Sequence, residues 1–245
     1  MNLKHLKFIL ISTPIGFLGS GRGGGVELTL VSMVKGLLEL GHEVTLVAPE
    51  GSVLPDACQR AQLITVSGIE QVSWQHQSKN HPMIIPRDGV LPKMLDRALQ
   101  IAKDYDAIIN LSYDWLPLWL TPHLEVKIFH LISMGGVSKL MKDVINNLSK
   151  SHHKRLAFHS NSQASDYFLK SEPIILGNGF DMKDYQFQIG TEGPLGWAGR
   201  VAPEKGLEDA VEVAASIGET ILVWGIIEDK NYASNIEASF PAGTI

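Results

Sequence analysis

The sequence predicts a doubly wound α/β protein built around a parallel sheet. Short runs rich in apolar and β-branched residues alternate along the chain with longer amphipathic stretches. Several of these runs have few polar residues at either alternating position, which is typical of strands that helices cover on both faces. This alternation favours an open sheet wound in two directions over a helical bundle or an all-β fold.

Nine apolar runs are expected to be strands: Lys7–Ser12, Glu43–Ala48, Gln62–Val66, Ala107–Leu111, Val126–Ile132, Leu156–His159, Ile174–Leu176, Leu195–Trp197 and Thr220–Trp224. Six amphipathic stretches between them are expected to be helices: Val26–Leu40, Val90–Asp104, Val137–Ser149, Gln163–Leu169, Leu207–Ser216 and Lys230–Ala238. We expect Leu195–Trp197 and Thr220–Trp224 to be adjacent parallel strands.

The Gly/Asn-rich turn at residues 176–181 predicts a domain boundary. We expect residues 1–178 to form one complete Rossmann-like domain and residues 179–245 to form an incomplete second α/β domain. Only 66 residues follow Gly179. They have room for about two βα units, which is less than a doubly wound domain needs.

Composition narrows the classes of function. The 245 residues are 44% hydrophobic and 19% charged, which excludes a disordered chain. The net charge of −5 disfavours a protein that binds the nucleic-acid backbone. The single cysteine, Cys58, excludes an intrachain disulfide and fits the cytoplasm, where we expect the protein. No apolar run approaches the roughly 18 residues of a membrane span, so we expect none.

A glycine-rich loop, residues 19–25, lies between the first strand and the first helix. It contains G-x-G-x-x-G, but residues 13–18 separate this motif from the strand. An NAD(P)-binding oxidoreductase is therefore an alternative that the spacing disfavours. The glycines let the backbone approach a ligand, and the helix N-terminus after them favours a phosphate. A flexible turn that needs positive φ is the alternative without a ligand.

A second candidate loop, residues 199–206, follows the strand predicted at Leu195–Trp197. Arg200 and Lys205 bring two cations to the end of a strand, where ligands of doubly wound sheets bind. A guanidinium fork and an ammonium group together can hold a diphosphate. A surface turn with a solvated Glu204–Lys205 pair is the alternative.

The stretch GRVAPEKGL resembles the G-R-x-x-x-E-K-G signature of the retaining GT-B glycosyltransferases of family 4, the group-1 glycosyl transferases. Further segments resemble that family in the same order: the loop GGGVE, the strand LGHEVTLVAP, the interdomain turn GNGFD and the strand LVWG. The resemblance runs from about Lys7 to Tyr232. Residues 111–117, 130–135 and 197–200 are most similar to the UDP-glucose:tetrahydrobiopterin (pteridine) glucosyltransferases.

The resemblance implies two Rossmann-like domains of the GT-B type and retaining transfer of a glucosyl or other hexosyl group. The N-terminal domain would hold a small hydroxylated acceptor such as a pterin, and the C-terminal domain a nucleotide sugar such as UDP-glucose. Contacts to the donor diphosphate would come from Arg200, Lys205 and the backbone of Gly23, Gly24 and Gly25. No cofactor and no metal are expected, because cations and helix ends neutralise the leaving diphosphate.

Three residues are candidate catalytic groups: Asp114, from its place after a predicted strand, and His130 and Ser133, by the same resemblance. The family places a sugar-contacting histidine near the end of the fifth strand, where Ser133 stands here and His130 lies three residues earlier. A plain core role is the alternative for His130. Asp114 follows a strand and could bind acceptor hydroxyls. Its alternative role is to cap the following turn.

Trp115 and Met134 are the further acceptor-binding candidates. Trp115 and Trp119 stand at i, i+4, and their aromatic faces could stack on a sugar or a pterin. The alternative is that both tryptophans are core residues over the sheet.

The family's E-x7-E element, which contacts sugar and ribose, has no counterpart before Ile245. Glu204 and Glu212 have this interval but flank a different helix. We therefore expect this chain alone to have little transferase activity, to bind UDP-glucose weakly and to self-associate through its incomplete C-terminal part. A non-catalytic binding module of the same fold is the alternative.

Overall fold

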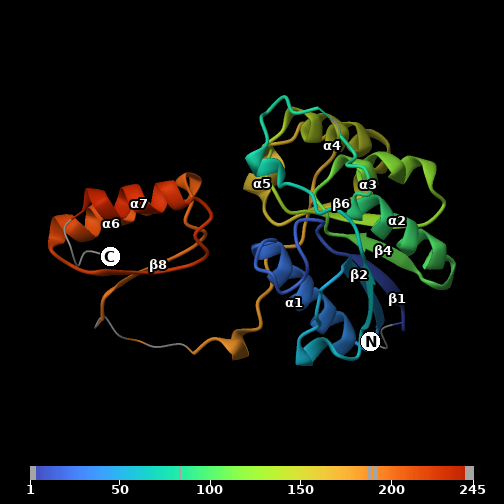
Figure 1. Cartoon of the computed structure of the whole chain (residues 1–245). Helices are drawn as coiled ribbons and strands as arrows, with labels where there is room; N and C mark the ends of the chain where they lie inside the picture. The colour runs from blue at the N-terminus through green and yellow to red at the C-terminus, as the bar shows by residue number, and fades with distance from the viewer. Residues whose placement is uncertain (1–3, 83, 187–188, 190–192, 241–245) are drawn as a thin grey trace. The chain divides into compact units, whose positions relative to one another are not determined.

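The computed structural model describes residues 4–82, 84–186, 189 and 193–240. The chain divides into two compact units, Met1–Met182 and Lys183–Ile245 (Figure 1).

A seven-stranded sheet with the order β3-β2-β1-β4-β5-β6-β7 forms the first unit. The strands are β1 (Lys7–Ile11), β2 (Glu43–Pro49), β3 (Gln62–Val66), β4 (Ala107–Asn110), β5 (Ile128–Ile132), β6 (Leu156–Phe158) and β7 (Ile174–Ile175). Every neighbouring pair is parallel. The chain winds outward from β1 to β3 and then from β4 in the opposite direction. The predicted doubly wound sheet is therefore confirmed.

Helices cover both faces of this sheet (Figure 1). They are α1 (Gly25–Glu39), α2 (Val90–Ile101), α3 (Trp115–Leu120), α4 (Lys139–His152) and α5 (Asn161–Ser165). The sequence did not predict α3, because six residues make less than two turns and show no helical period. The helix predicted at Gln163–Leu169 is observed as α5. It begins two residues earlier and ends at Ser165, so residues 166–169 lie outside it.

Strand β1 shows why the sequence alternation is weak. Its side chains point alternately to the two faces. Leu10 packs into the cluster that contains α1, whereas Ile9 and Ile11 pack into the cluster that contains α2. All three are fully buried. Because helices cover both faces here, each of these three positions requires an apolar residue.

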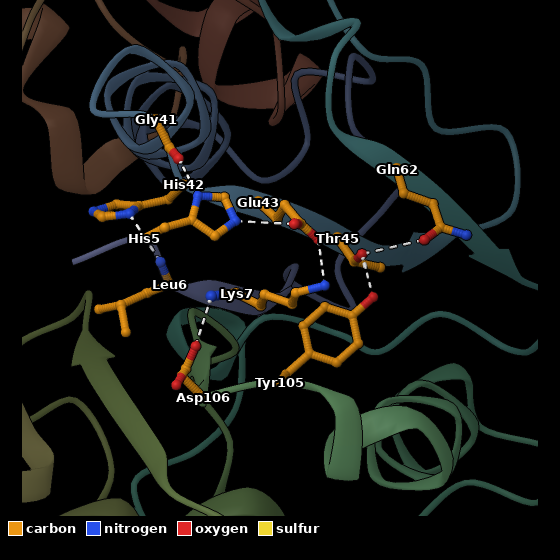
Figure 2. A network of polar contacts seen from close by, with 10 residues as sticks. All are labelled: His5, Leu6, Lys7, Gly41, His42, Glu43, Thr45, Gln62, Tyr105 and Asp106. Atoms are coloured by element: carbon orange, nitrogen blue, oxygen red, sulfur yellow. Dashed lines mark hydrogen bonds and ion pairs between the residues drawn. The ribbon is translucent and has the colours of Figure 1, made fainter.

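A polar network joins the amino ends of β1 and β2 (Figure 2). The His5 ring contacts the Gly41 carbonyl at 2.6 Å and the Glu43 carboxylate at 2.9 Å, and the Lys7 ammonium lies 2.9 Å from the same carboxylate. The hydrogen bond to Glu43, and then that to Gly41, raise the pKa of His5. These exposed pairs add little stability each. They lie at the edge opposite the strands' carboxyl ends.

The second unit contains the parallel pair β8 (Leu195–Ala198) and β9 (Ile221–Trp224), with α6 (Leu207–Ile217) and α7 (Lys230–Ser239). The predicted adjacency of these two strands is confirmed. Both helices lie on the same side of the strands (Figure 1). The small core between them contains Val201, Leu207, Val211, Ala214, Ile221 and Ile236.

Gly225 lets the backbone after β9 pass directly beside the loop after β8. Its φ is +153°, and a Cβ there would lie 1.6 Å from the Gly199 carbonyl oxygen. The Gly199 N–H donates to the Trp224 carbonyl at 2.9 Å and joins the same two segments. The close approach fixes residues 199–201 against residues 224–228.

We expect Gly225→Ala to destabilise the second unit by about 2 kcal/mol or more, because backbone atoms must move apart. Gly218→Ala is the matched control, since Gly218 has φ +72° but open space around its missing Cβ. Its expected cost is about 1 kcal/mol. Amide hydrogen exchange of residues 193–240 measures both. Equal losses in the two variants would contradict the packing role of Gly225.

Candidate functional site

The carboxyl ends of β1, β4 and β5 lie side by side at one edge of the first sheet. The winding direction reverses between β1 and β4, and ligands of open parallel sheets bind at such a point. Three predicted parts of the site follow these strands: the glycine-rich loop after β1, Asp114 after β4, and Ser133 with Met134 after β5. The topology therefore brings these predicted residues to one edge.

A buried carboxylate fills the interior of the glycine-rich loop. Glu27, in the first turn of α1, is 7% exposed. Its carboxylate accepts hydrogen bonds from the N–H groups of Gly19, Gly21 and Gly23 (2.8, 3.3 and 2.7 Å) and from the Ser20 hydroxyl (3.3 Å). From sequence, the helix dipole alone explains a Glu at this position, so its role in the loop was not predicted.

The loop conformation depends on glycine for two reasons. Gly21 and Gly24 have φ of +73° and +57°, which disfavour other residues. A Cβ on Gly23 would lie 2.8 Å from Glu27 and 2.9 Å from Thr13. The N–H of Gly24 donates to the Gly21 carbonyl at 3.1 Å. The N–H groups of Gly23 and Gly24, expected to face a phosphate, are thus engaged within the loop.

His130 lies in the interior of the first unit, with 1% exposure. Its Nδ1 lies 3.1 Å from the Asn110 side-chain amide, and its Nε2 lies 2.7 Å from the Thr121 hydroxyl. Burial, followed by the charge of Arg155, lowers the pKa of His130 to about 3. A neutral ring with both nitrogens engaged is the core role that the sequence left open, and this placement favours it.

Asn110 connects His130 to the segment that precedes Asp114. Besides the His130 contact, its amide nitrogen donates to the Ser112 carbonyl at 3.0 Å. Its side-chain oxygen accepts from the Ser112 hydroxyl at 2.6 Å and from the Ser112 N–H at 3.3 Å. The residues after β4 are therefore held by a buried network with its polar groups paired.

Asp114 is 3% exposed and accepts two hydrogen bonds. One comes from the Leu116 N–H at 2.9 Å, so Asp114 caps α3 as the alternative interpretation predicted. The other comes from the indole N–H of Trp74 at 3.2 Å. Burial raises the pKa of Asp114 to about 6, although both hydrogen bonds oppose the shift.

No sequence pattern indicated a role for Trp74, which lies in the long segment between β3 and α2. This segment runs along the carboxyl edge of the sheet. The Gln71 N–H donates to the Pro14 carbonyl at 3.0 Å after β1, Trp74 binds Asp114 after β4, and the Lys139 N–H donates to the Lys79 carbonyl at 3.2 Å after β5. Residues 71–79 therefore lie along the carboxyl ends of β1, β4 and β5, where we expect the acceptor to bind.

The two tryptophans of α3 differ in their surroundings. Trp115 is half-buried against the core that contains α4. Trp119 is 54% exposed, and its ring lies 5.1 Å from that of His123. The core interpretation therefore fits Trp115 in part and does not fit Trp119.

Arg200 and Lys205 lie in the loop after β8 of the second unit. The Arg200 guanidinium binds the carboxylates of Glu204, at 3.1 Å, and Glu228. Glu228 follows β9 and was not among the predicted residues, because 28 positions separate it from Arg200. Lys205 is exposed. The Gly206 backbone after it is left-handed, with φ 63°, and leads into α6.

Within residues 4–82, 84–186, 189 and 193–240, no group of three or more His, Cys, Asp or Glu side chains is arranged to hold a metal ion. None of the helices in the same ranges is long and apolar enough to cross a membrane.

Glu27→Ala should release the glycine-rich loop. We expect faster amide exchange at Gly19, Gly21 and Gly23 and a loss of about 2–3 kcal/mol in unfolding free energy, because buried donors lose a charged acceptor. Glu39→Ala, at the exposed end of the same helix, is the control. It should leave the exchange of these glycines unchanged and alter the free energy of unfolding by no more than about 0.5 kcal/mol. Unchanged exchange in Glu27→Ala would contradict this role.

The lowered pKa of His130 predicts that the free energy of unfolding falls when the solution is acidified. Between pH 6.5 and about 3 the unfolded chain binds a proton that the folded His130 excludes, so its contribution falls as the pH falls through this window. Asp114 acts in the opposite sense between pH 3.8 and about 6. His130→Gln should therefore flatten the loss of unfolding free energy on acidification, measured by urea titration. Parallel curves for variant and wild type would contradict the prediction.

Comparison with known proteins bears on the fold. No family model matches the chain, and no curated protein matches its sequence. The chain is similar in structure to AviGT4, a glycosyltransferase involved in avilamycin A biosynthesis, with a TM-score of 0.62 and 18% identity over 97% of this chain and 62% of that one. For sucrose-phosphate synthase from Thermosynechococcus elongatus the TM-score is 0.65, with 16% identity over 96% of this chain and 66% of that one.

A glycosyltransferase from Rickettsia africae ESF-5 is similar at a TM-score of 0.58 and 16% identity, over 96% of this chain and 65% of that one. The chain thus spans less than two thirds of the length of each of these three structures. Similarity at such identities concerns the fold. The chain has an α/β fold of the GT-B type, with one complete Rossmann-like doubly wound domain and part of a second α/β domain.

Proposed function

We propose that the chain belongs to a retaining glycosyltransferase that transfers a glucosyl or other hexosyl group from a nucleotide sugar to a small hydroxylated acceptor such as a pterin. The first domain would hold the acceptor, and the second would hold the donor. The observation that carries the proposal is the cationic loop, residues 199–206, at the carboxyl end of β8 in a GT-B fold.

Two features of this loop suit a diphosphate. Glu204 and Glu228 hold the Arg200 guanidinium beside the end of β8, and its donors form a planar fork that matches phosphate oxygens. Exposed Lys205 adds a point charge on the same turn. A bound diphosphate would share the guanidinium with these carboxylates or displace one of them.

The acceptor would bind at the carboxyl edge of the first sheet. Asp114 supplies a carboxylate, Trp115 an aromatic face, Met134 an apolar contact and Ser133 a hydroxyl. The Ser133 hydroxyl is buried and has no hydrogen-bond partner in the described part of the chain. It therefore retains the capacity to bind a ligand hydroxyl.

The chemistry follows from charge. Cleavage of the bond between the sugar and the diphosphate leaves negative charge on the diphosphate, which Arg200 and Lys205 stabilise. The acceptor hydroxyl loses a proton as the new bond forms. Asp114 is our candidate to take it, because burial brings its pKa to about 6 and a carboxylate has lone pairs beyond the two that Leu116 and Trp74 use.

Two alternative functions follow from the sequence. A non-catalytic module would bind the acceptor and form no glycoside. An NAD(P) oxidoreductase needs the glycine-rich loop for its pyrophosphate. The Glu27 carboxylate inside that loop and the cations in the other unit disfavour it.

Titration calorimetry with UDP-glucose tests the donor site. We expect Arg200→Ala and Lys205→Ala each to weaken the affinity about 10- to 100-fold, because each removes a charged hydrogen bond to the diphosphate. Lys230→Ala, an exposed lysine of the same unit, should leave the affinity unchanged. Affinity equal to wild type in the Arg200 and Lys205 variants would contradict the assignment. Formation of a glycoside from UDP-glucose and a pterin would identify an enzyme rather than a binding module.

A further inference from the structure

Two buried tyrosines hold the loop that follows β5. Tyr113, between β4 and α3, and Tyr167, after α5, are each 4% exposed. Their hydroxyl oxygens lie 3.0 Å apart. Each hydroxyl therefore lies in the interior, where it requires a hydrogen-bond partner.

The partners are two consecutive backbone carbonyls of the β5 loop. The Tyr167 hydroxyl lies 2.8 Å from the Met134 carbonyl oxygen and 3.0 Å from that of Gly135. The Tyr113 hydroxyl lies 3.1 Å from the Gly135 oxygen. The two hydroxyls therefore can donate one hydrogen bond to each of the two carbonyl oxygens. Burial raises the pKa of Tyr113 to about 12 and also raises the pKa of Tyr167, so both remain donors.

A third contact fixes the next peptide group. The Gly136 N–H donates to the Asp166 carboxylate at 2.9 Å, and a Cβ on Gly135 would lie 2.4 Å from the same carboxylate. The Val137 N–H then donates back to the Gly135 carbonyl at 2.8 Å. Hydrogen bonds therefore fix the backbone of residues 134–137. Some of their partners lie in the loop itself, and others lie in neighbouring segments.

These contacts join three segments at the carboxyl edge. Tyr113 directly precedes Asp114, Met134 directly follows Ser133, and Tyr167 belongs to the segment after β6. The Tyr113–Gly135 hydrogen bond therefore fixes the segment of Asp114 relative to that of Ser133. A phenylalanine at position 167 would fill the same space but would remove the hydroxyl that lies beside the Met134 carbonyl. A phenylalanine at position 113 would remove the hydrogen bond that joins this segment to the Gly135 carbonyl.

We infer that Tyr113 and Tyr167 are positioning residues of the acceptor site, which hold Ser133 and Met134 in a fixed relation to Asp114. The inference rests on the proposed acceptor site. It assigns no contact between the tyrosines and the acceptor, because both hydroxyls already donate to the β5 loop.

The test uses Tyr113→Phe and Tyr167→Phe, with Tyr105→Phe as the matched control. The Tyr105 hydroxyl lies 2.7 Å from the Thr45 hydroxyl at the opposite edge of the same sheet (Figure 2). Amide exchange of residues 135–137 measures the loop, and fluorescence titration with a pterin measures acceptor affinity. We expect Tyr113→Phe and Tyr167→Phe to speed this exchange and to weaken pterin binding about tenfold. Tyr105→Phe should change neither.

Unchanged exchange at residues 135–137 would overturn the inference. Faster exchange with full pterin affinity would also overturn it, because it would show that the tyrosines only stabilise the loop. A wild-type chain that binds no pterin would instead refute the acceptor half of the proposed function and, with it, the need for positioning. The behaviour of the wild type therefore separates the two failures.

Discussion

Burial of both faces of a parallel sheet is the constraint on which the first domain depends. Helices on each side favour apolar residues along the strands, as fully buried Ile9, Leu10 and Ile11 illustrate. His130 in β5 is buried with both ring nitrogens in hydrogen-bond contact with neighbouring side chains. Most polar groups of the sheet therefore lie at the strand ends. At the amino ends this gives exposed pairs such as His5–Glu43, which bind strands together. At the carboxyl ends it gives the loops in which the candidate residues lie.

The same constraint explains why so many of these candidate groups already have partners. A polar group near a dry core must form hydrogen bonds within the protein or lose several kcal/mol. Glu27 meets this need for the glycine-rich loop, Asn110 for His130, and the tyrosine pair for the loop after β5. The loops are consequently ordered by their own contacts, and the buried Ser133 hydroxyl is an exception without a hydrogen-bond partner in the described residues.

The sequence predicted the strands well because burial on both faces leaves a local signature, the uninterrupted apolar run. It also predicted the parallel pair β8 and β9 and the position of Arg200 after β8. Contacts between distant residues left no such signature. Trp74 meets Asp114 across 40 positions, and Glu228 meets Arg200 across 28. The role of His130 depended on Asn110 and Thr121, which no pattern around the histidine could indicate.

We propose that the loop after β8 holds the diphosphate of a nucleotide sugar. Amide hydrogen exchange in the presence of saturating UDP-glucose, and separately of NADH, tests it most directly, because the method locates the ligand even when binding is weak. We expect UDP-glucose to slow exchange in residues 199–206 and 224–228, and NADH to slow neither segment. Protection of residues 19–25 by NADH, with no effect of UDP-glucose on residues 199–206, would contradict it.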